Sequence, residues 1–113
     1  MRDKDRQILS KIRQYCTEIN SVVDGVEFET FVDDFMINRT CTMTLVQIGE
    51  LAKRLSEDFK SKHNLVPWRR IGDTRNFIVH EYDDIDWETL WQIIRDNVPE
   101  LLEFTDEILK KIA

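Results

Sequence analysis

The sequence predicts an all-α fold, an antiparallel bundle of four main helices plus one short helix. Three observations predict it. Apolar residues recur at spacings of three and four, which is the period of one helix face. Only 3 Gly and 2 Pro interrupt the 113 residues, and no segment alternates apolar and polar residues as a strand does. With 42% hydrophobic residues, a chain of this length is expected to form a single helical domain over residues 1–113.

The first helix is predicted from an apolar stripe near the N-terminus. Its members follow one another at spacings of 4, 3, 4, 3 and 4: Ile8, Ile12, Tyr15, Ile19, Val22 and Val26. The pair Asp24-Gly25 is expected to end this helix, because glycine tolerates the left-handed backbone of a helix C-terminus.

A short helix is predicted over residues 27–37, followed by an interruption at residues 38–40, where Asn38 or Thr40 can cap the next helix. That next helix has the most regular stripe of the chain: Cys41, Leu45, Ile48, Ala52, Leu55 and Phe59. It is expected to end in residues 63–67, because the residue before Pro67 is pushed away from helical angles.

A fourth helix is expected to start near Pro67-Trp68 and to continue into residues 75–82, which read RNFIVHEY. The acidic residues 83–86 should end it, and Asp86 is placed to cap a fifth helix. Pro99 lies inside the apolar pattern of that last helix, so a kink is predicted there.

The charge of the chain is uneven. The formal net charge is −6, yet residues 52–75 carry 7 basic and 3 acidic side chains, a net charge of +4. This segment leads directly into residues 75–82, so an acidic protein can still offer a polyanion one positive face. No apolar run reaches the roughly 18 residues of a membrane span, and the N-terminus has no signal-peptide pattern, which favours a cytoplasmic location. Cys16 and Cys41 fall on apolar helix faces and are expected to be reduced interior thiols.

Residues 75–82 hold an arginine, a histidine and a tyrosine within eight positions: Arg75, His80 and Tyr82. On an ideal helix Tyr82 lies almost beneath Arg75, and Asn76 is placed to hydrogen-bond His80 and fix its tautomer. Arg75 and His80 point roughly 140° apart. Either the helix ends near His80, or a two-fold dimer brings Arg75 of one chain towards His80 of the other.

These residue types suit cleavage of RNA. The 2′-hydroxyl of RNA is a built-in nucleophile, so the protein has to exchange protons and stabilise charge at phosphorus. A histidine that titrates near neutral pH can exchange the protons. The planar arginine fork matches phosphate oxygens and keeps its charge. This chemistry needs no metal and no cofactor.

The chain resembles the HepT-like family, whose members are minimal forms of the HEPN superfamily (higher eukaryotes and prokaryotes nucleotide-binding domains). The family motif is Arg, four residues, His, one residue, Tyr, and it is complete here in Arg75, His80 and Tyr82, with the polar Asn76 after the arginine. Asp73 departs from the family pattern, because many members have glycine two residues before the arginine.

The resemblance implies an HEPN-like bundle and a specific function. The family consists of metal-independent ribonucleases that act as homodimers and as toxins of toxin–antitoxin modules. The resemblance therefore assigns catalysis to Arg75 and His80, with Asn76 in support. It also implies a partner, a minimal nucleotidyltransferase antitoxin that silences the toxin by transferring AMP to the motif tyrosine, Tyr82 in this chain.

Simpler interpretations remain open. His80 can be a structural histidine, Arg75 can form a surface ion pair with an acidic neighbour such as Glu81, and Tyr82 can be an ordinary buried tyrosine. A second functional class is a non-catalytic HEPN-type module that binds a nucleotide or a partner protein through the same arginine and histidine. The acidic net charge and Asp73 favour this class, whereas the complete motif favours the ribonuclease.

Overall fold

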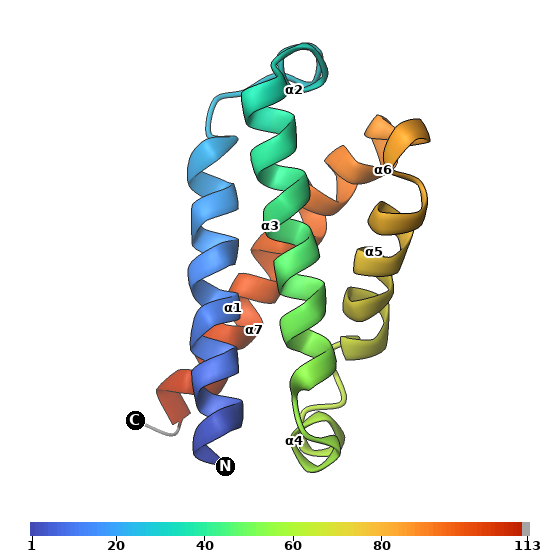
Figure 1. Ribbon diagram of the computed structural model, residues 1–113. Helices are drawn as coiled ribbons and strands as arrows, with labels where there is room; N and C mark the ends of the chain where they lie inside the picture. The colour runs from blue at the N-terminus through green and yellow to red at the C-terminus, as the bar shows by residue number, and fades with distance from the viewer. Residues whose placement is uncertain (112–113) are drawn as a thin grey trace.

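The structure, a computed structural model, describes residues 1–111, apart from the side chain of Tyr82. The described residues contain no strand, which confirms the all-α prediction. Four long helices run antiparallel to their neighbours along the chain (Figure 1): α1 (Asp3–Val22), α3 (Phe35–Arg54), α5 (Trp68–His80) and α7 (Val98–Lys111). Shorter segments connect them: α2 (Phe28–Asp33), α4 (Glu57–Lys62), the 3-10 turn η1 (Tyr82–Asp84), α6 (Trp87–Gln92) and the π-helical η2 (Ile93–Asn97).

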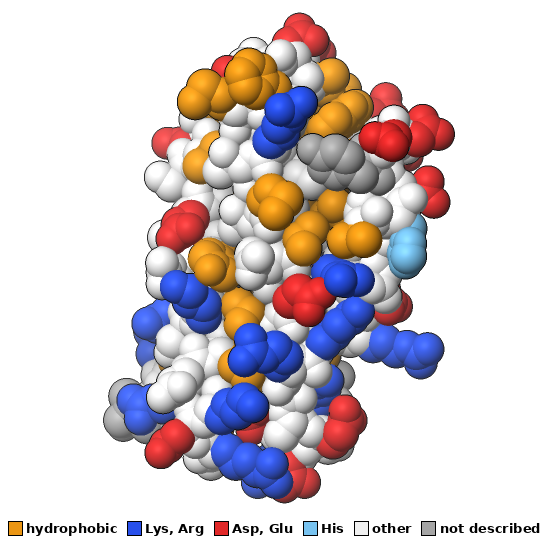
Figure 2. All heavy atoms as spheres, in the orientation of Figure 1, with side chains coloured by type: hydrophobic (Ala, Val, Ile, Leu, Met, Phe, Trp, Pro, Cys, Tyr) orange, Lys and Arg blue, Asp and Glu red, His pale blue; other side chains and the backbone are white. Residues whose placement is uncertain are grey.

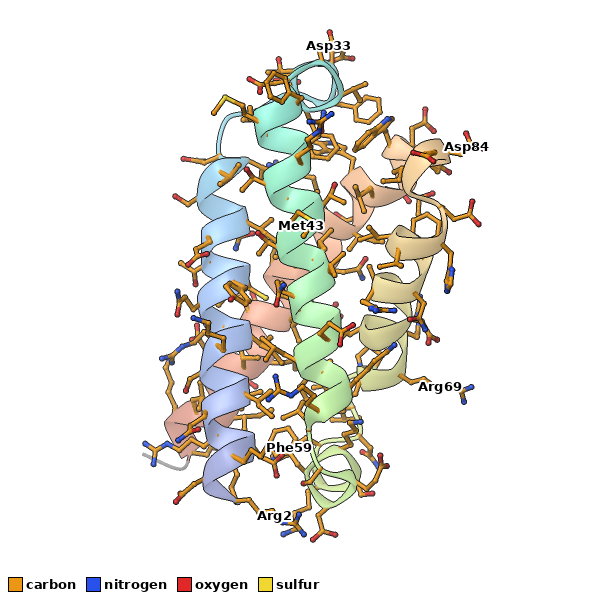
Figure 3. All side chains as sticks on the ribbon, viewed as in Figure 1. Arg2, Asp33, Met43, Phe59, Arg69 and Asp84 are labelled. Atoms are coloured by element: carbon orange, nitrogen blue, oxygen red, sulfur yellow. The ribbon has the colours of Figure 1, made fainter. Side chains whose placement is uncertain are left out.

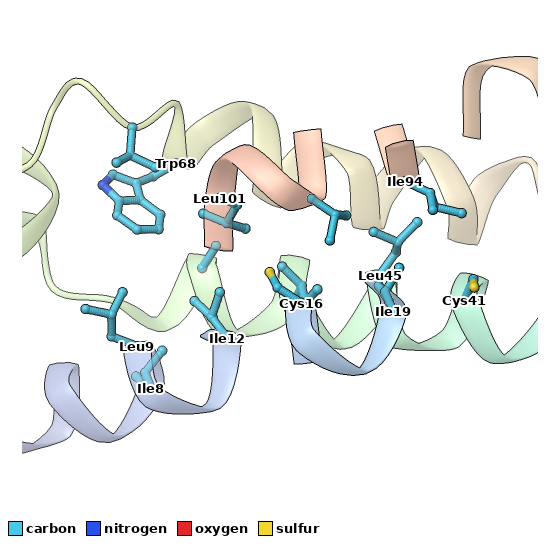
Figure 4. Packing of buried hydrophobic residues seen from close by; sticks show 14 of the residues in the cluster. Ile8, Leu9, Ile12, Cys16, Ile19, Cys41, Leu45, Trp68, Ile94 and Leu101 are labelled. Carbon is cyan, nitrogen blue, oxygen red and sulfur yellow. The ribbon is translucent and has the colours of Figure 1, made fainter. Parts of the chain in front are cut away.

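The core lies between α1, α3 and α7, and α5 packs onto α3 from the other side. In Figure 1, α7 crosses behind α1 and α3. Figure 4 shows side chains from these helices interdigitating, among them Ile12, Cys16, Leu45, Ile94 and Leu101. Cys16 and Cys41 are free and buried, as the sequence predicts. Burial raises the pKa of the Cys16 thiol to about 12 and that of Cys41 to about 11.

The start of the molecule follows the sequence prediction. Ile8, Ile12 and Ile19 are buried along α1. Gly25 follows the helix with a φ of 71°, the left-handed conformation for which glycine was expected here. The short chain segment after it leads directly into α2.

The boundary between α2 and α3 differs from the prediction. Asp34 is the cap of α3, and its carboxylate accepts from the backbone N–H groups of Met36 and Ile37. Asn38, expected in an interruption, is buried inside α3. Its amide donates to the carbonyls of Phe31 and Val32, at 3.1 and 3.0 Å. These hydrogen bonds pair carbonyl groups at the C-terminal end of α2. Thr40 is also inside α3, so neither residue caps it.

The third helix also ends earlier than predicted. α3 stops at Arg54, and Phe59 belongs to α4, a second short helix that the prediction did not contain. Ser56 caps α4 by accepting from the Phe59 N–H. The same serine donates its N–H and hydroxyl to the buried Asp5 of α1, at 2.8 and 2.6 Å. The interruption between α3 and α4 is therefore held by Asp5, which is 51 positions away from Ser56 in the sequence.

The C-terminal helical segment begins as predicted, because Asp86 caps α6 by accepting from the N–H groups of Glu88 and Thr89. A π-helical turn, η2, lies directly before Pro99. Proline has no N–H to donate and clashes with the preceding turn, and a widened turn accommodates both effects. Within residues 1–111, no helix combines the length and the apolar character that a membrane crossing would need.

Candidate functional site

Arg75 lies in the middle of α5, at the point where this helix comes closest to α3. The facing residue on α3 is Gly49. A Cβ atom at Gly49 would lie 2.5 Å from the Arg75 Cβ and 3.2 Å from the Arg75 backbone nitrogen. Only a glycine therefore permits this approach, and the tight contact fixes the position from which the arginine side chain extends.

A group of four polar side chains surrounds this contact. Glu50 and Lys53 come from α3, and Arg75 and Asn76 from α5; we call them the polar cluster. The Nε of Arg75 is buried and forms an ion pair with the Glu50 carboxylate. Arg75 Nη1 donates to Asn76 Oδ1 at 3.1 Å, and Lys53 Nζ donates to the same oxygen at 2.8 Å. Two cations and one amide are thus held by contacts across the α3–α5 seam.

Arg75 remains accessible to solvent despite these contacts, since 32% of its side-chain surface is exposed. The described contacts use Nε and Nη1, which leaves Nη2 for an incoming group. The simpler interpretation of Arg75, an ion pair with an acidic neighbour, agrees with the structure, although the partner is Glu50 of α3 and not Glu81. The two N–H groups of Nη2 can still donate to the oxygens of a phosphate.

Asn76 does not have the contact predicted for it. The expected hydrogen bond to His80 is absent from the described contacts, and the Asn76 oxygen accepts from Lys53 and Arg75 instead. The prediction failed because it considered only residues one turn apart on the same helix. Lys53, which is 23 residues away, was the stronger donor within reach.

His80 is the last residue of α5 and is exposed to solvent. Of the two alternatives from the sequence, the helix does end there, with Glu81 as its C-cap. Within the described contacts, no hydrogen bond or ion pair joins His80 to Arg75. Five residues along a helix separate the two by about 7.5 Å of rise and point them apart. One chain therefore presents the cation and the imidazole in different directions.

The third motif residue, Tyr82, begins the 3-10 turn η1 rather than continuing α5. The expectation that it lies beneath Arg75 on one continuous helix is therefore wrong, because the helical spacing stops at His80. Its side chain lies outside the described residues. Both sequence neighbours, Glu81 and Asp83, are exposed.

Sequence reasoning missed Gly49, Glu50 and Lys53. They stand in the run IGELAKR at residues 48–54, where a glycine between apolar positions was the available signal. The three tryptophans pack against aromatic neighbours within the fold. Trp68 is buried against Phe59, and its indole N–H donates to the His63 carbonyl. Trp87 and Trp91 pack against Phe31 of α2.

Across residues 1–111, no three His, Cys, Asp or Glu side chains group as metal ligands would.

The fold and this site define a class of protein, a small α-helical bundle with an arginine and a histidine exposed on one helix. Comparison with known families makes this specific. Residues 12–108 match the model of the family described as "Ribonuclease HepT-like". The chain belongs to this HepT-like family.

Individual relatives agree with the family match. A "Putative RNase" of Caldanaerobacter subterraneus subsp. tengcongensis is 37% identical over 94% of this chain and 95% of its own length. A "Putative RNase" of Methanocaldococcus jannaschii is 32% identical over 95% of this chain and 88% of its own length. A "Probable ribonuclease HepT" of Thermococcus cleftensis is 28% identical, with 89% and 92% covered. No solved structure matches the chain.

Proposed function

We propose that this protein is a metal-independent endoribonuclease in which Arg75 and His80 carry the chemistry and Asn76 supports it. The observation that carries the proposal is the polar cluster, which holds Arg75 by Nε and Nη1 and leaves Nη2 without a described contact. Family membership and the printed names of the relatives support the same activity.

The proposed reaction uses the nucleophile of the substrate. The 2′-oxygen attacks phosphorus and forms the new O–P bond, while the bond from phosphorus to the 5′-oxygen breaks. The imidazole of His80 accepts the 2′-hydroxyl proton, and the imidazolium that forms donates a proton to the departing 5′-oxygen. Arg75 stabilises the charge that builds on the non-bridging oxygens. The products are a 2′,3′-cyclic phosphate and a 5′-hydroxyl.

The active form is proposed to be a homodimer, because Arg75 and His80 of one chain point in different directions. Two-fold pairing would bring Arg75 of one protomer towards His80 of its partner. The exposed surface of α3 and α5 supports this arrangement, since it presents large apolar side chains. Met43 of α3 is 55% exposed and Val79 of α5 is 46% exposed. Figure 2 shows hydrophobic side chains distributed over this face, and Figure 3 labels Met43 within it.

The biological role is proposed to be that of a toxin neutralised by a minimal nucleotidyltransferase antitoxin that transfers AMP to Tyr82. The end of α5 at His80 and the turn at Tyr82–Asp84 place this residue outside the regular helix, between exposed neighbours. An AMP group on Tyr82 would add negative charge and bulk two residues after His80, which would oppose the binding of RNA there. Intact-mass measurement after co-expression, with peptide mapping, tests the site; AMP on Tyr15 would contradict it.

Cleavage of a labelled RNA with and without EDTA tests the enzymatic proposal. Activity should persist in EDTA and yield the cyclic phosphate, and His80→Ala should abolish it. Activity lost in EDTA and restored by a divalent ion would contradict the mechanism.

Light scattering at micromolar concentration should show a dimer. A monomer would contradict the proposal that two protomers share one active site.

The second candidate is a non-catalytic module that binds a nucleotide or partner through the same residues. The ion pair between Arg75 and Glu50 within one chain favours it, because part of the arginine charge is already compensated. RNA that binds with micromolar affinity but is not cleaved by the dimer would decide for this alternative.

A further inference from the structure

Charge is segregated between the two ends of the molecule. Residues 1–6 and 53–70 together carry nine basic and four acidic side chains. Figure 2 shows most of the visible Lys and Arg side chains over the lower part of the molecule, where the start of α1, the end of α3 and α4 lie. We call this region the basic end and represent it by five exposed residues: Arg2, Arg6, Arg54, Lys62 and Arg69.

The opposite end is acidic. Residues 24–34 and 81–88 each carry five acidic side chains and no Lys or Arg. These two segments meet because Phe31 of α2 packs against Trp87 and Trp91 of α6. Figure 3 labels Asp33 and Asp84 at this end and Arg2 and Arg69 in the lower part. We call it the acidic end.

The fold assembles the basic end from distant segments. Asp5 of α1 is 3% exposed and accepts two hydrogen bonds from Ser56, which joins the start of α1 to the break between α3 and α4. Arg2 and Lys62 line one shallow hollow beside this contact. Asp5 and Asp58 also line this hollow, so its cations lie beside two carboxylates, of which Asp5 is held by its hydrogen bonds to Ser56.

The cations of the basic end are available to a ligand. None of its five residues forms an ion pair with another residue in the described part of the chain. Salt screens charges beyond about 8 Å at physiological ionic strength, so a bound polyanion responds mainly to the cations that it passes directly. Exposed and unpaired arginines and lysines are the side chains that bind a nucleic-acid backbone without reading its sequence.

The candidate active site borders the basic end along α3 and α5. Lys53 of the polar cluster is followed directly by Arg54, and Arg69 lies six residues before Arg75, about 9 Å along α5 and roughly 120° around it. In the other direction, α5 passes His80 and leads into the acidic residues 81–88. An anionic strand that contacts Arg75 thus meets cations on one side and repulsive carboxylates on the other.

We propose that the basic end is a one-sided binding surface for the backbone of single-stranded RNA. This inference rests on the proposed ribonuclease function and names where its substrate lies. The strand leaves the polar cluster over the end of α3, α4 and the start of α5, and it is kept away from α2 and α6. The contacts are with phosphates and are independent of base sequence. The surface serves affinity and strand placement, whereas Arg75 and His80 serve the chemistry.

The test compares two double variants with the same loss of charge. Arg54→Gln/Arg69→Gln removes two cations of the basic end. Arg39→Gln/Arg95→Gln removes two arginines that lie over the aromatic rings of Phe35 and Trp91, away from that end. Both are made in the His80→Ala background, so that binding is measured without cleavage. The probe is a fluorescein-labelled 20-nucleotide polyuridine, titrated by anisotropy at several salt concentrations.

The basic-end variant should bind the RNA roughly tenfold more weakly, and the slope of log affinity against log salt should fall by about 1.4, or 0.7 for each lost phosphate contact. The control variant should stay within about twofold, with its slope unchanged. In the cleaving protein, the basic-end substitutions should raise KM and leave kcat as it is. Equal losses in both variants, or no loss in either, would overturn the proposal.

Two further outcomes separate this inference from others. Selective loss of RNA binding in the basic-end variant supports it even if the wild-type protein cleaves no RNA, a result that would count against the ribonuclease alone. Leu65 and Met1 are exposed apolar residues near the basic end, which a membrane could also bind. Binding to phosphatidylglycerol vesicles is therefore measured in a second experiment. Binding to vesicles that depends on Arg54 and Arg69, with RNA affinity unaffected by them, would assign the surface to a membrane and overturn the proposal.

Discussion

Arg75 and His80 lie on the same helix, yet their surroundings are opposite. Arg75 faces α3, where Gly49 permits close contact and Glu50 and Asn76 hold the guanidinium. His80 ends the helix, is exposed, and has no described partner in its own chain. The fold of a single chain therefore fixes the guanidinium of Arg75, whereas no described hydrogen bond or ion pair fixes the imidazole of His80.

The largest expected effect comes from removing the two side chains themselves. His80→Ala should reduce RNA cleavage by about a hundredfold or more, because proton transfer is lost, while the melting temperature stays nearly unchanged. Arg75→Ala should also abolish activity and remain folded, but with a small loss of stability, because Glu50 loses its partner. Cleavage assays and thermal unfolding measure both. A large drop in melting temperature for His80→Ala would show that the imidazole is structural.

The second effect concerns the contact that positions Arg75. Gly49→Ala places a methyl group against the Arg75 Cβ and backbone, so α3 and α5 have to separate. The expected cost is about 1–3 kcal/mol in the free energy of unfolding, together with a roughly tenfold fall in kcat. Denaturant unfolding and single-turnover kinetics are the measurements.

Gly72→Ala is the matched control on the same seam. Its added Cβ would meet the Lys53 side chain at 3.0 Å, which can move, and alanine gains up to about 1 kcal/mol in helix propensity. Stability should therefore stay close to that of the wild type, and kcat should fall less than in Gly49→Ala, because only the Lys53 hydrogen bond to Asn76 is disturbed. If both glycine variants behaved alike, close packing at Gly49 would not be what positions Arg75.

The third effect should leave the site untouched and act on the fold alone. Burial by itself would raise the pKa of Asp5, but the hydrogen bonds from Ser56, with the charge of Arg2, lower it below its ordinary value. A carboxyl group with a lowered folded pKa stabilises the protein above its unfolded pKa of about 3.9 and loses this contribution as the pH falls through the folded value.

Asp5→Asn should therefore lower the free energy of unfolding by about 1–3 kcal/mol at pH 7, with a smaller difference from the wild type at pH 3. Denaturant titrations at both pH values measure this, and kcat at neutral pH should not change. If the difference in the free energy of unfolding between the wild type and the variant grew as the pH fell, the pKa of Asp5 would not be lowered by folding.

The smallest effect is expected at Asp73, an exposed carboxylate two residues before Arg75. Its charge opposes a phosphate near the guanidinium, although solvent screens it. Asp73→Asn should strengthen RNA binding by about twofold at low salt, with no gain at 0.5 M salt. Anisotropy at the two salt concentrations provides the check. A tenfold gain would mean that Asp73 restrains activity directly.

Local rules predicted much of the helical framework. The apolar stripe predicted α1, Gly25 follows it with positive φ, and Asp86 caps α6 where the sequence placed a cap. Such features depend on neighbours within one or two turns, which the sequence displays directly.

The same rules failed at Asn38 and Phe59. Asn38 has a cap-forming side chain, but its amide bonds the end of α2 from inside α3. Phe59 continues a perfect stripe, but the helix breaks before it.

The sequence by itself determined the all-α class, the apolar faces, the cap at Asp86 and the spacing of Arg75, His80 and Tyr82. Only the tertiary structure decided which partners these residues meet. Glu50 is 25 positions from Arg75, Lys53 is 23 from Asn76, and Asp5 is 51 from Ser56. Antiparallel packing also collected the charges into two opposite ends. The physical reason is that helix propensity and capping act over a few residues, whereas ion pairs and close backbone contacts depend on how whole helices dock.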